Sequence, residues 1–334
     1  MDNLLKIKII ILLFILLFSL DYSQAKNNFL IFKNIHRYSL WQPRDSHSVV
    51  VYKNKVFLLG GLNGNKNVIE PGSVNYEKAE HFSDVWVSED LKKWRKILDK
   101  APWGGRRSMV VLEFRDKLWL FGGYGPKIGL KNDIWVSEDG INWLLVKKQA
   151  EWQPREGHTV TEFNNKLYLI GGVDYKNKKV FNDVWFSDDG LHWQLATEKA
   201  PFSPRWDHAT AVFGNKIWLA GGMNLERRIF RDVWYSENGN DWFLISKRVP
   251  WAARQGHSLL SFGNKLWLIG ILSKENDIWY SLDGLHWLKN KFKTAWSGRE
   301  DFASIIFKNR ICILGGMDVF WQWKNDIWCS ENLK

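Results

Sequence analysis

The sequence predicts an all-β fold: a six-bladed β-propeller of four-stranded antiparallel blades, closed by the N-terminal strand. Two observations predict it. One stretch of about 50 residues, clearest over 152–193, recurs six times in the 334-residue chain. Each copy holds four short runs of strand type separated by turn residues, which is typical of an antiparallel meander. One meander cannot bury both of its faces, so six consecutive copies favour a radial array in which each packs against the next.

Every copy contains the same elements in the same order. An aromatic residue lies three residues before an arginine, and two apolar runs then flank a two-residue turn such as Asn164-Asn165. The second run ends in a glycine pair in five copies and in Gly270-Ile271 in the fifth. A polar loop, an Asp-x-Trp step, a tight turn and a further tryptophan follow. The aspartates of this step are Asp84, Asp133, Asp183, Asp232, Asp277 and Asp326.

The two ends of the chain supply complementary pieces of one blade. In five copies the last tryptophan lies nine residues before the next opening, and counting back nine residues from Trp41 gives Phe32. The sixth copy stops short of an equivalent tryptophan, because the position eight residues beyond Trp328 lies past Lys334. We therefore expect the segment around 30–32 to form the fourth strand of the sixth blade, which removes two exposed strand edges.

The first 25 residues read as a secretory signal. Lys6 and Lys8 precede the apolar run 9–20, and Ser23-Gln24-Ala25 forms a small-x-small cleavage site. A bilayer span needs about 20 apolar residues, so this run is too short for one, although an uncleaved anchor is the alternative. We expect cleavage before Lys26 and a secreted or periplasmic protein with no stable membrane insertion. No linker divides 26–334, which predicts a single domain.

The chain has two cysteines, Cys312 and Cys329, on consecutive strands of the last copy. In an antiparallel hairpin, the residue numbers of facing positions add up to a constant. The constant that pairs the two cysteines also pairs Gly316 with Asn325, at the ends of the connecting loop. Facing positions bring Cα atoms to about 4.5–5.5 Å, within disulfide range. Export makes oxidation feasible, so we expect a disulfide; two buried free thiols are the alternative.

The Pro-Arg-x-x-His opening, the glycine pair and the distant tryptophan resemble kelch repeats, the motif of the galactose-oxidase-like β-propellers, over residues 28–334. The resemblance implies the propeller fold and a binding platform more often than an enzyme. Copper oxidases of this type use a cysteine-crosslinked tyrosine with histidine ligands. The only cysteines here lie in strands of the last blade, so no cofactor is expected.

Two residue types recur around the predicted ring. Four histidines share one repeat position, too far apart in a six-bladed ring for a metal with ligands about 2 Å away, and we expect structural, hydrogen-bonded histidines. They are His47, His158, His208 and His257. An arginine occurs in every copy and is expected to hold neighbouring blades together with the regular aspartate, although in ligand-binding kelch domains arginines at this position can line the channel mouth. The arginines are Arg44, Arg106, Arg155, Arg205, Arg254 and Arg299.

Function is expected where the copies differ. The connections between strands two and three and between blades emerge on one face, and they vary, whereas the opposite hairpins are short and uniform; variable loops on a rigid ring usually carry binding. Three tryptophans outside repeat positions lie in these connections and either offer platforms for a ligand or fold over the blade tops. The candidate ligand-binding residues are Arg44, Asp45, Arg107, Glu156, Arg205, Trp206, Asp207, Arg227, Arg228, Arg299, Glu300, Trp321 and Trp323.

The net charge of +11, concentrated on this face, favours an anionic partner. Nucleic acid fits poorly with export, so the expected partner is an acidic carbohydrate or a protein. The alternatives are a sugar-processing enzyme that resembles sialic acid mutarotases, and a structural envelope protein. Acid–base chemistry would fall to carboxylates near the channel mouth, but neither a nucleophile motif nor a pair at catalytic spacing assigns a catalytic residue. These carboxylates are Asp45, Glu156, Asp207, Glu300 and Asp301.

Overall fold

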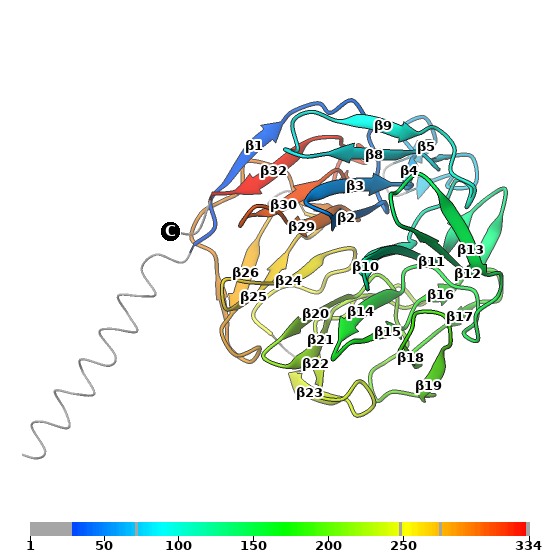
Figure 1. Cartoon of the computed structure of the whole chain (residues 1–334). Coiled ribbons are helices and arrows are strands. Elements are labelled where there is room, and N and C mark those ends of the chain that lie inside the picture. Colours follow the sequence, from blue (N-terminus) through cyan, green and yellow to red (C-terminus); the bar gives the residue numbers. More distant parts are fainter. Residues whose placement is uncertain (1–28, 71–72, 247–248, 274–275, 332–334) are drawn as a thin grey trace, which may run out of the picture.

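Six four-stranded antiparallel sheets surround a central axis in the computed structural model (Figure 1). The structure describes residues 29–70, 73–246, 249–273 and 276–331. The predicted signal segment lies outside these residues. Within them there is no helix long and apolar enough to cross a membrane. The predicted six-bladed propeller is confirmed.

The blades follow the chain in order, each with its first strand nearest the axis. Blade one contains β2 (Ser48–Tyr52), β3 (Lys55–Leu59), β8 (Val85–Ser88) and β9 (Arg95–Leu98). Blade two contains β10 (Val110–Phe114), β11 (Lys117–Gly125), β12 (Gly129–Ser137) and β13 (Trp143–Lys147). Blade three contains β14 (Thr159–Phe163), β15 (Lys166–Ile170), β18 (Val184–Ser187) and β19 (Gln194–Thr197).

The second half of the ring repeats this plan. Blade four contains β20 (Ala209–Phe213), β21 (Lys216–Ala220), β22 (Val233–Ser236) and β23 (Phe243–Ser246). Blade five contains β24 (Ser258–Phe262), β25 (Lys265–Ile269), β26 (Ile278–Ser281) and β27 (Trp287–Lys289). Blade six contains β29 (Ala303–Ile306), β30 (Ile311–Leu314), β32 (Ile327–Ser330) and β1 (Phe32–His36).

Shorter strands brace the connections. They are β4 (Leu62–Asn63), β5 (Val68–Glu70), β6 (Ser73–Val74), β7 (Glu80–His81), β16 (Val173–Asp174), β17 (Lys179–Val180), β28 (Arg299–Glu300) and β31 (Met317–Asp318). The hairpins between first and second strands use the predicted two-residue turn. Asn164 and Asn165 have φ of 50° and 59°, as a type I′ turn requires, and Phe163 pairs with Lys166 across it.

The N-terminal strand closes the ring as the tryptophan spacing predicts. β1 pairs with β32 at the outer edge of blade six, so the first and last described strands lie side by side (Figure 1). In the other blades the opening aromatic ring meets the fourth-strand tryptophan edge to face, as Trp152 meets Trp193 at 6.4 Å between centroids. In blade six Phe32 takes that place against Trp296, at 4.8 Å. The two chain ends therefore share one core.

The side chains of the repeated arginines stabilise their own blades and are not free to bind a ligand. The guanidinium of Arg155 donates to both carboxylate oxygens of Asp183 in its own blade, at 2.6 and 2.9 Å, while its backbone N–H donates to a carbonyl of the preceding blade, at Lys131. The other five arginines pair in the same way with the aspartate of their own blade. All six side chains are buried. The regular aspartate is thus the partner, as expected, but the pair lies within one blade, and the bond to the neighbouring blade comes from the backbone. The same pairing applies to the ligand candidates Arg44, Arg205 and Arg299.

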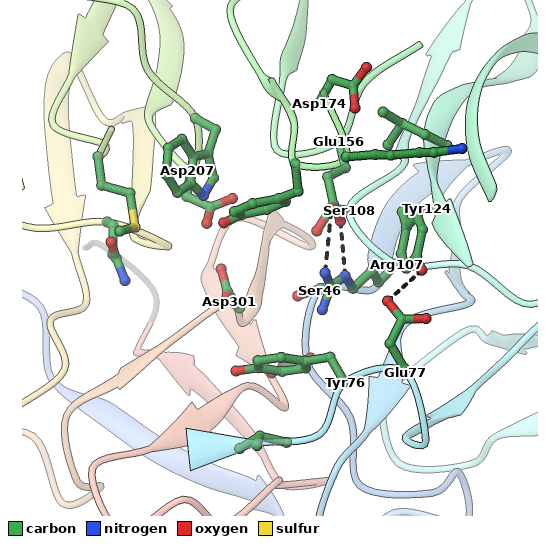
Figure 2. A pocket seen from close by; sticks show the side chains of 18 of the residues that line it. Ser46, Tyr76, Glu77, Arg107, Ser108, Tyr124, Glu156, Asp174, Asp207 and Asp301 are labelled. Atoms are coloured by element: carbon green, nitrogen blue, oxygen red, sulfur yellow. Dashed lines mark hydrogen bonds and ion pairs between the residues drawn. The ribbon is translucent and has the colours of Figure 1, made fainter. Parts of the chain in front are cut away.

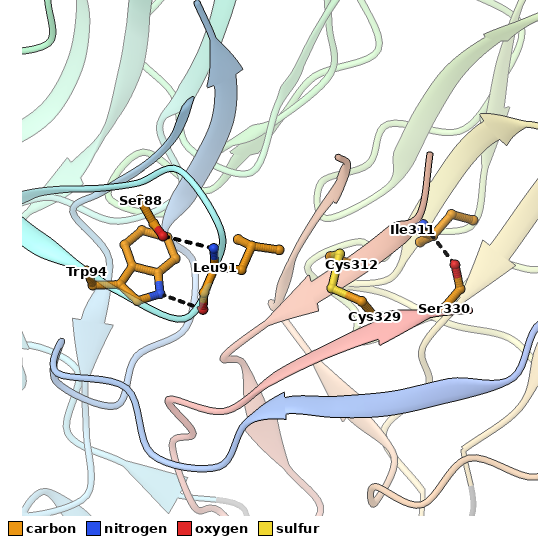
Figure 3. The surroundings of a disulfide bond; sticks show 7 residues. All are labelled: Ser88, Leu91, Trp94, Ile311, Cys312, Cys329 and Ser330. Carbon is orange, nitrogen blue, oxygen red and sulfur yellow. Dashed lines mark hydrogen bonds between the residues drawn. A yellow bond between two sulfur atoms is a disulfide. The ribbon is translucent and has the colours of Figure 1, made fainter. Parts of the chain in front are cut away.

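Cys312 faces Cys329 in the register that the constant sum predicts, and the two are joined by a disulfide (Figure 3). Their Cα atoms are 4.1 Å apart. Both side chains are buried in the core between blades six and one. The bond therefore links β30 to β32, the strand on which the N-terminal strand closes the ring.

Replacing both Cys312 and Cys329 with alanine is expected to lower the free energy of unfolding by about 3 kcal/mol, since the bond closes a loop with a sequence separation of 17 residues. Denaturant unfolding of the oxidised protein, with the reduced wild type as the control, measures the loss. Thiol titration of the denatured, unreduced wild type should find no free thiol, and two titratable thiols would contradict the bond.

Candidate functional site

A cavity of 1210 Å³ opens at the end of the axis where the variable connections meet (Figure 2). All six blades contribute to its lining through the one or two residues that follow the repeated arginine. These residues include Asp45, Ser46, Arg107, Ser108, Glu156, Trp206, Asp207, Gln255, Glu300 and Asp301. The candidate site therefore consists of side chains that differ between copies, on a backbone whose conformation repeats from copy to copy.

That backbone is fixed by two sets of hydrogen bonds. The residue after the arginine forms an antiparallel β-bridge with the residue after the glycine pair in its own blade, as Glu156 does with Val173. This needs glycine at position 172, whose φ is 106° and where an added Cβ would lie 3.0 Å from the Glu156 carbonyl oxygen. The next residue has a positive φ in every blade, and five of these residues donate an N–H bond to their counterpart in the neighbouring blade. The donors are Ser46, Ser108, Asp207, Gly256 and Asp301, at 2.7 to 2.9 Å.

A side-chain ion pair links blades two and three. Among the described residues, these two blades lack the backbone bond of the other neighbours, since the N–H of Gly157 does not donate to Ser108. Arg107 donates from Nε and Nη2 to the two carboxylate oxygens of Glu156, at 2.9 and 3.2 Å. Burial lowers the pKa of Arg107, but the charge and hydrogen bonds of Glu156 outweigh burial and raise it. Arg107 is thus ionised and paired with Glu156.

Tyrosines that the sequence analysis did not select surround this pair. The Arg107 guanidinium lies 4.9 Å from the ring centroid of Tyr76 and 5.4 Å from that of Tyr124. Tyr124 donates a hydrogen bond to Glu77 at 2.6 Å. Tyr76 and Glu77 belong to the connection between strands two and three of blade one, and Tyr124 lies near the end of β11. Only their place in or beside a variable connection could have pointed to them.

Four other carboxyl groups of the cavity resist ionisation. Burial, followed by the charge of Asp301, raises the pKa of Glu300 to about 8 and also raises the pKa values of Asp45 and Asp207. Burial raises the pKa of Asp301 itself to about 6. Near neutral pH this group of side chains therefore contains both protonated and ionised carboxyls, which can donate as well as accept hydrogen bonds.

The lining of the cavity is acidic, although the whole chain is basic. Its lining holds seven carboxyl side chains, and among the described lining residues the cations are Arg107, already paired, and Lys176. Arg227 and Arg228 are exposed on the loop of blade four and do not line the cavity. The expectation that basic residues hold an anion at the mouth is therefore corrected, because the repeated arginines are buried in ion pairs and the loop arginines lie outside.

Of the three unrepeated tryptophans, Trp206 lines the cavity. It is buried, and its ring lies 5.3 Å from that of the half-exposed Tyr175, edge to face. Trp323 is buried beneath the long connection of blade one, where it packs with Leu62, and Trp321 packs against the same cluster. Trp321 and Trp323 therefore follow the alternative in which loop tryptophans fold over the blade tops.

The four histidines line a smaller cavity of 160 Å³ below the first. Burial and the neighbouring arginines lower the imidazole pKa to about 3 at His47, His158 and His208. His208 shares a hydrogen bond with Thr159 at 3.2 Å, but the ring nitrogens of His158 have no partner among the described residues. The expectation of fully hydrogen-bonded histidines is thus met only in part. Within the described residues, no group of three or more acidic, histidine or cysteine side chains is placed to hold a metal ion.

Comparisons with known proteins support the fold. A family model described as the KLHDC2/KLHL20/DRC7 Kelch-repeats domain matches residues 46–270 and, in a second match, 157–332. A solved structure titled "Structure of YjhT" is similar, with a TM-score of 0.68 and 17% sequence identity, covering 86% of this chain and 94% of that one. At this identity the likeness shows the fold alone. No curated protein matches the chain.

Proposed function

The chain belongs to the kelch-repeat β-propellers, and on that premise we propose that it binds a carbohydrate in the cavity at the channel mouth. The observation that carries the proposal is the mixed lining, in which carboxyl groups from several blades face the same space as Tyr76, Tyr175 and Trp206. Carboxyls donate to and accept from sugar hydroxyls, and aromatic rings pack on the apolar faces of sugars.

The size of the cavity supports the same ligand class. At 1210 Å³ it exceeds the range of about 300–1,000 Å³ that is usual for small-molecule sites, so it has room for a short oligosaccharide. An acidic sugar, which the overall charge favoured, would place its carboxylate among the cavity's own carboxyls. We therefore propose a ligand without negative charge. The predicted export of the chain would give the site access to extracellular or periplasmic glycans.

Replacing Glu300 with glutamine tests the site. A glycan array of neutral, acidic and amino oligosaccharides supplies the ligand, and calorimetry then measures its affinity for each variant. We expect Glu300→Gln to bind at least about ten times more weakly, because the amide nitrogen of glutamine cannot accept a hydrogen bond as a carboxyl oxygen does, and a buried donor left unpaired costs about 1–3 kcal/mol. Glu138→Gln is the matched control, because Glu138 is exposed on a hairpin of the opposite face. Equal affinity in the two variants would contradict the placement.

A sugar-processing enzyme is the second candidate, favoured by one observation. The raised pKa values of Glu300 and Asp301, about 8 and about 6, suit a neighbouring general acid and general base near neutral pH. Such a pair could transfer protons during the opening and closing of a sugar ring without a cofactor. NMR exchange measurements on the bound sugar would detect turnover that Glu300→Gln and Asp301→Asn each abolish, whereas a binding module would give none.

A further inference from the structure

One buried oxygen in the candidate site lacks a partner. Asp45 is 2% exposed and lines the cavity, and its Oδ1 atom has no hydrogen-bond partner among the described residues. A buried acceptor left without a donor is costly, and in native proteins it points to a group that the structure does not contain. A ligand that donates hydrogen bonds would satisfy this oxygen.

The groups around Asp45 make a cationic donor more favourable than a neutral one. Asp207 and Asp301 point into the open middle of the cavity opposite Arg107 (Figure 2). The charge of Asp301 disfavours ionisation of both Asp45 and Asp207, although the three come from blades six, one and four. A cation close to Asp301 and to the two carboxyls that it disfavours relieves that repulsion.

The charge of Arg107 lowers the pKa values of Asp45, Asp207 and Asp301, but among the described residues its guanidinium forms no ion pair with them. The guanidinium of Arg107 is committed to Glu156 and lies over two tyrosine rings. That arrangement demonstrates that the aromatic lining accommodates a positive charge at 4.9 and 5.4 Å from ring centroids. The exposed face of Tyr175, beside Trp206, offers a further ring on the Asp207 side of the cavity.

We propose that the carbohydrate bound here carries a free amine, so that the ligand is an amino sugar whose ammonium group lies among Asp45, Asp207 and Asp301. This assignment rests on the proposed function and deepens it. The ammonium supplies three N–H donors, one of which meets the unpaired oxygen of Asp45, while the sugar ring packs against Tyr175. Attraction to the chain as a whole does not explain this preference, because the net charge of +11 repels a cation outside the cavity.

Three trisaccharides of similar shape test the inference: a glucosamine trimer, its fully N-acetylated counterpart and a glucose trimer. Calorimetry with the whole mature protein at neutral pH compares them. We expect the glucosamine trimer to bind at least ten times more tightly than the other two. In Asp45→Asn/Asp207→Asn that preference should fall to about twofold or less. Glu138→Gln, on the opposite face, should keep it.

The outcomes separate the two claims. If the neutral trimers bind as tightly as the glucosamine trimer, the amino-sugar assignment is overturned and carbohydrate binding stands. A glucosamine preference that persists in the double variant would overturn the placement of the ammonium at these aspartates. If no sugar on the array binds while spermidine does, the carbohydrate proposal fails and the amine interaction is independent of it. Circular dichroism and melting of the double variant verify that its ring is folded.

Discussion

Deletion of residues 26–36 is expected to open the propeller and to lower its free energy of unfolding by at least about 5 kcal/mol. The deleted segment includes β1, which covers the edge of β32 by pairing with Ser330, Cys329 and Trp328. It also removes Leu30 and Phe32, both buried, each of which contributes about 1.5–3 kcal/mol by burial. The side chain of Asn290 loses its bonds to the backbone N–H and C=O of Leu30.

Differential scanning calorimetry measures the loss, and light scattering measures the association that an uncovered strand edge promotes. Lys33→Ala is the control within the same strand. The Lys33 side chain is 69% exposed and pairs only with Glu331, so its removal should cost less than about 1 kcal/mol. A deletion variant that melts at the wild-type temperature would show that β1 does not close the ring.

The sequence predicted those parts of the fold that repeat. Six copies of one pattern average out local ambiguity, so the two-residue turn at Asn164-Asn165 and the role of Arg155 could be read from any copy. The register of the strands could also be predicted, because the residue numbers of facing positions in a hairpin add up to a constant. This placed Cys312 opposite Cys329. Phe32 was found as the missing member of a repeated position.

The candidate site was predictable only in outline. The residues after each arginine were identified because they differ between copies, and the cavity lining contains them. The charge of the cavity was not predictable, because Arg227 and Glu156 count equally in a sequence, whereas one lies on an outer loop and the other near the axis. The burial of Trp323 depends on the fold of the long connection of blade one, which follows no repeat. Tyr76 reaches the cavity from that same connection.

Replacing Glu300 with glutamine and Asp301 with asparagine together is expected to stabilise the protein at alkaline pH while weakening its site. Burial raises the pKa of Glu300 from 4.5 to about 8 and that of Asp301 from 3.8 to about 6. In the folded protein these groups hold protons that the unfolded chain has released. The contribution of these two groups to the wild-type free energy of unfolding is therefore fully present below about pH 4 and declines as the pH rises to about 8.

The double variant has no proton to lose at these positions, so it should escape that decline. Each unit of difference in pKa corresponds to about 1.4 kcal/mol, which makes the advantage at pH 9 on the order of 8 kcal/mol. The neutral histidines of the lower cavity, whose pKa values are lowered, destabilise the fold as the pH falls below 6.5. That effect is common to both proteins, so the difference between them isolates the two carboxyls.

Denaturant unfolding at pH 4, 6.5 and 9 measures this difference. We expect the curves of the two proteins to lie within about 1 kcal/mol at pH 4 and to separate steadily above it. Glu138→Gln, which removes an exposed carboxylate whose pKa is lowered by Lys117, should show no gain at pH 9. Parallel pH profiles of the double variant and the wild type would mean that Glu300 and Asp301 ionise normally. A stability gain joined to lost affinity would instead show that the ring tolerates costly buried carboxyls because the ligand needs them.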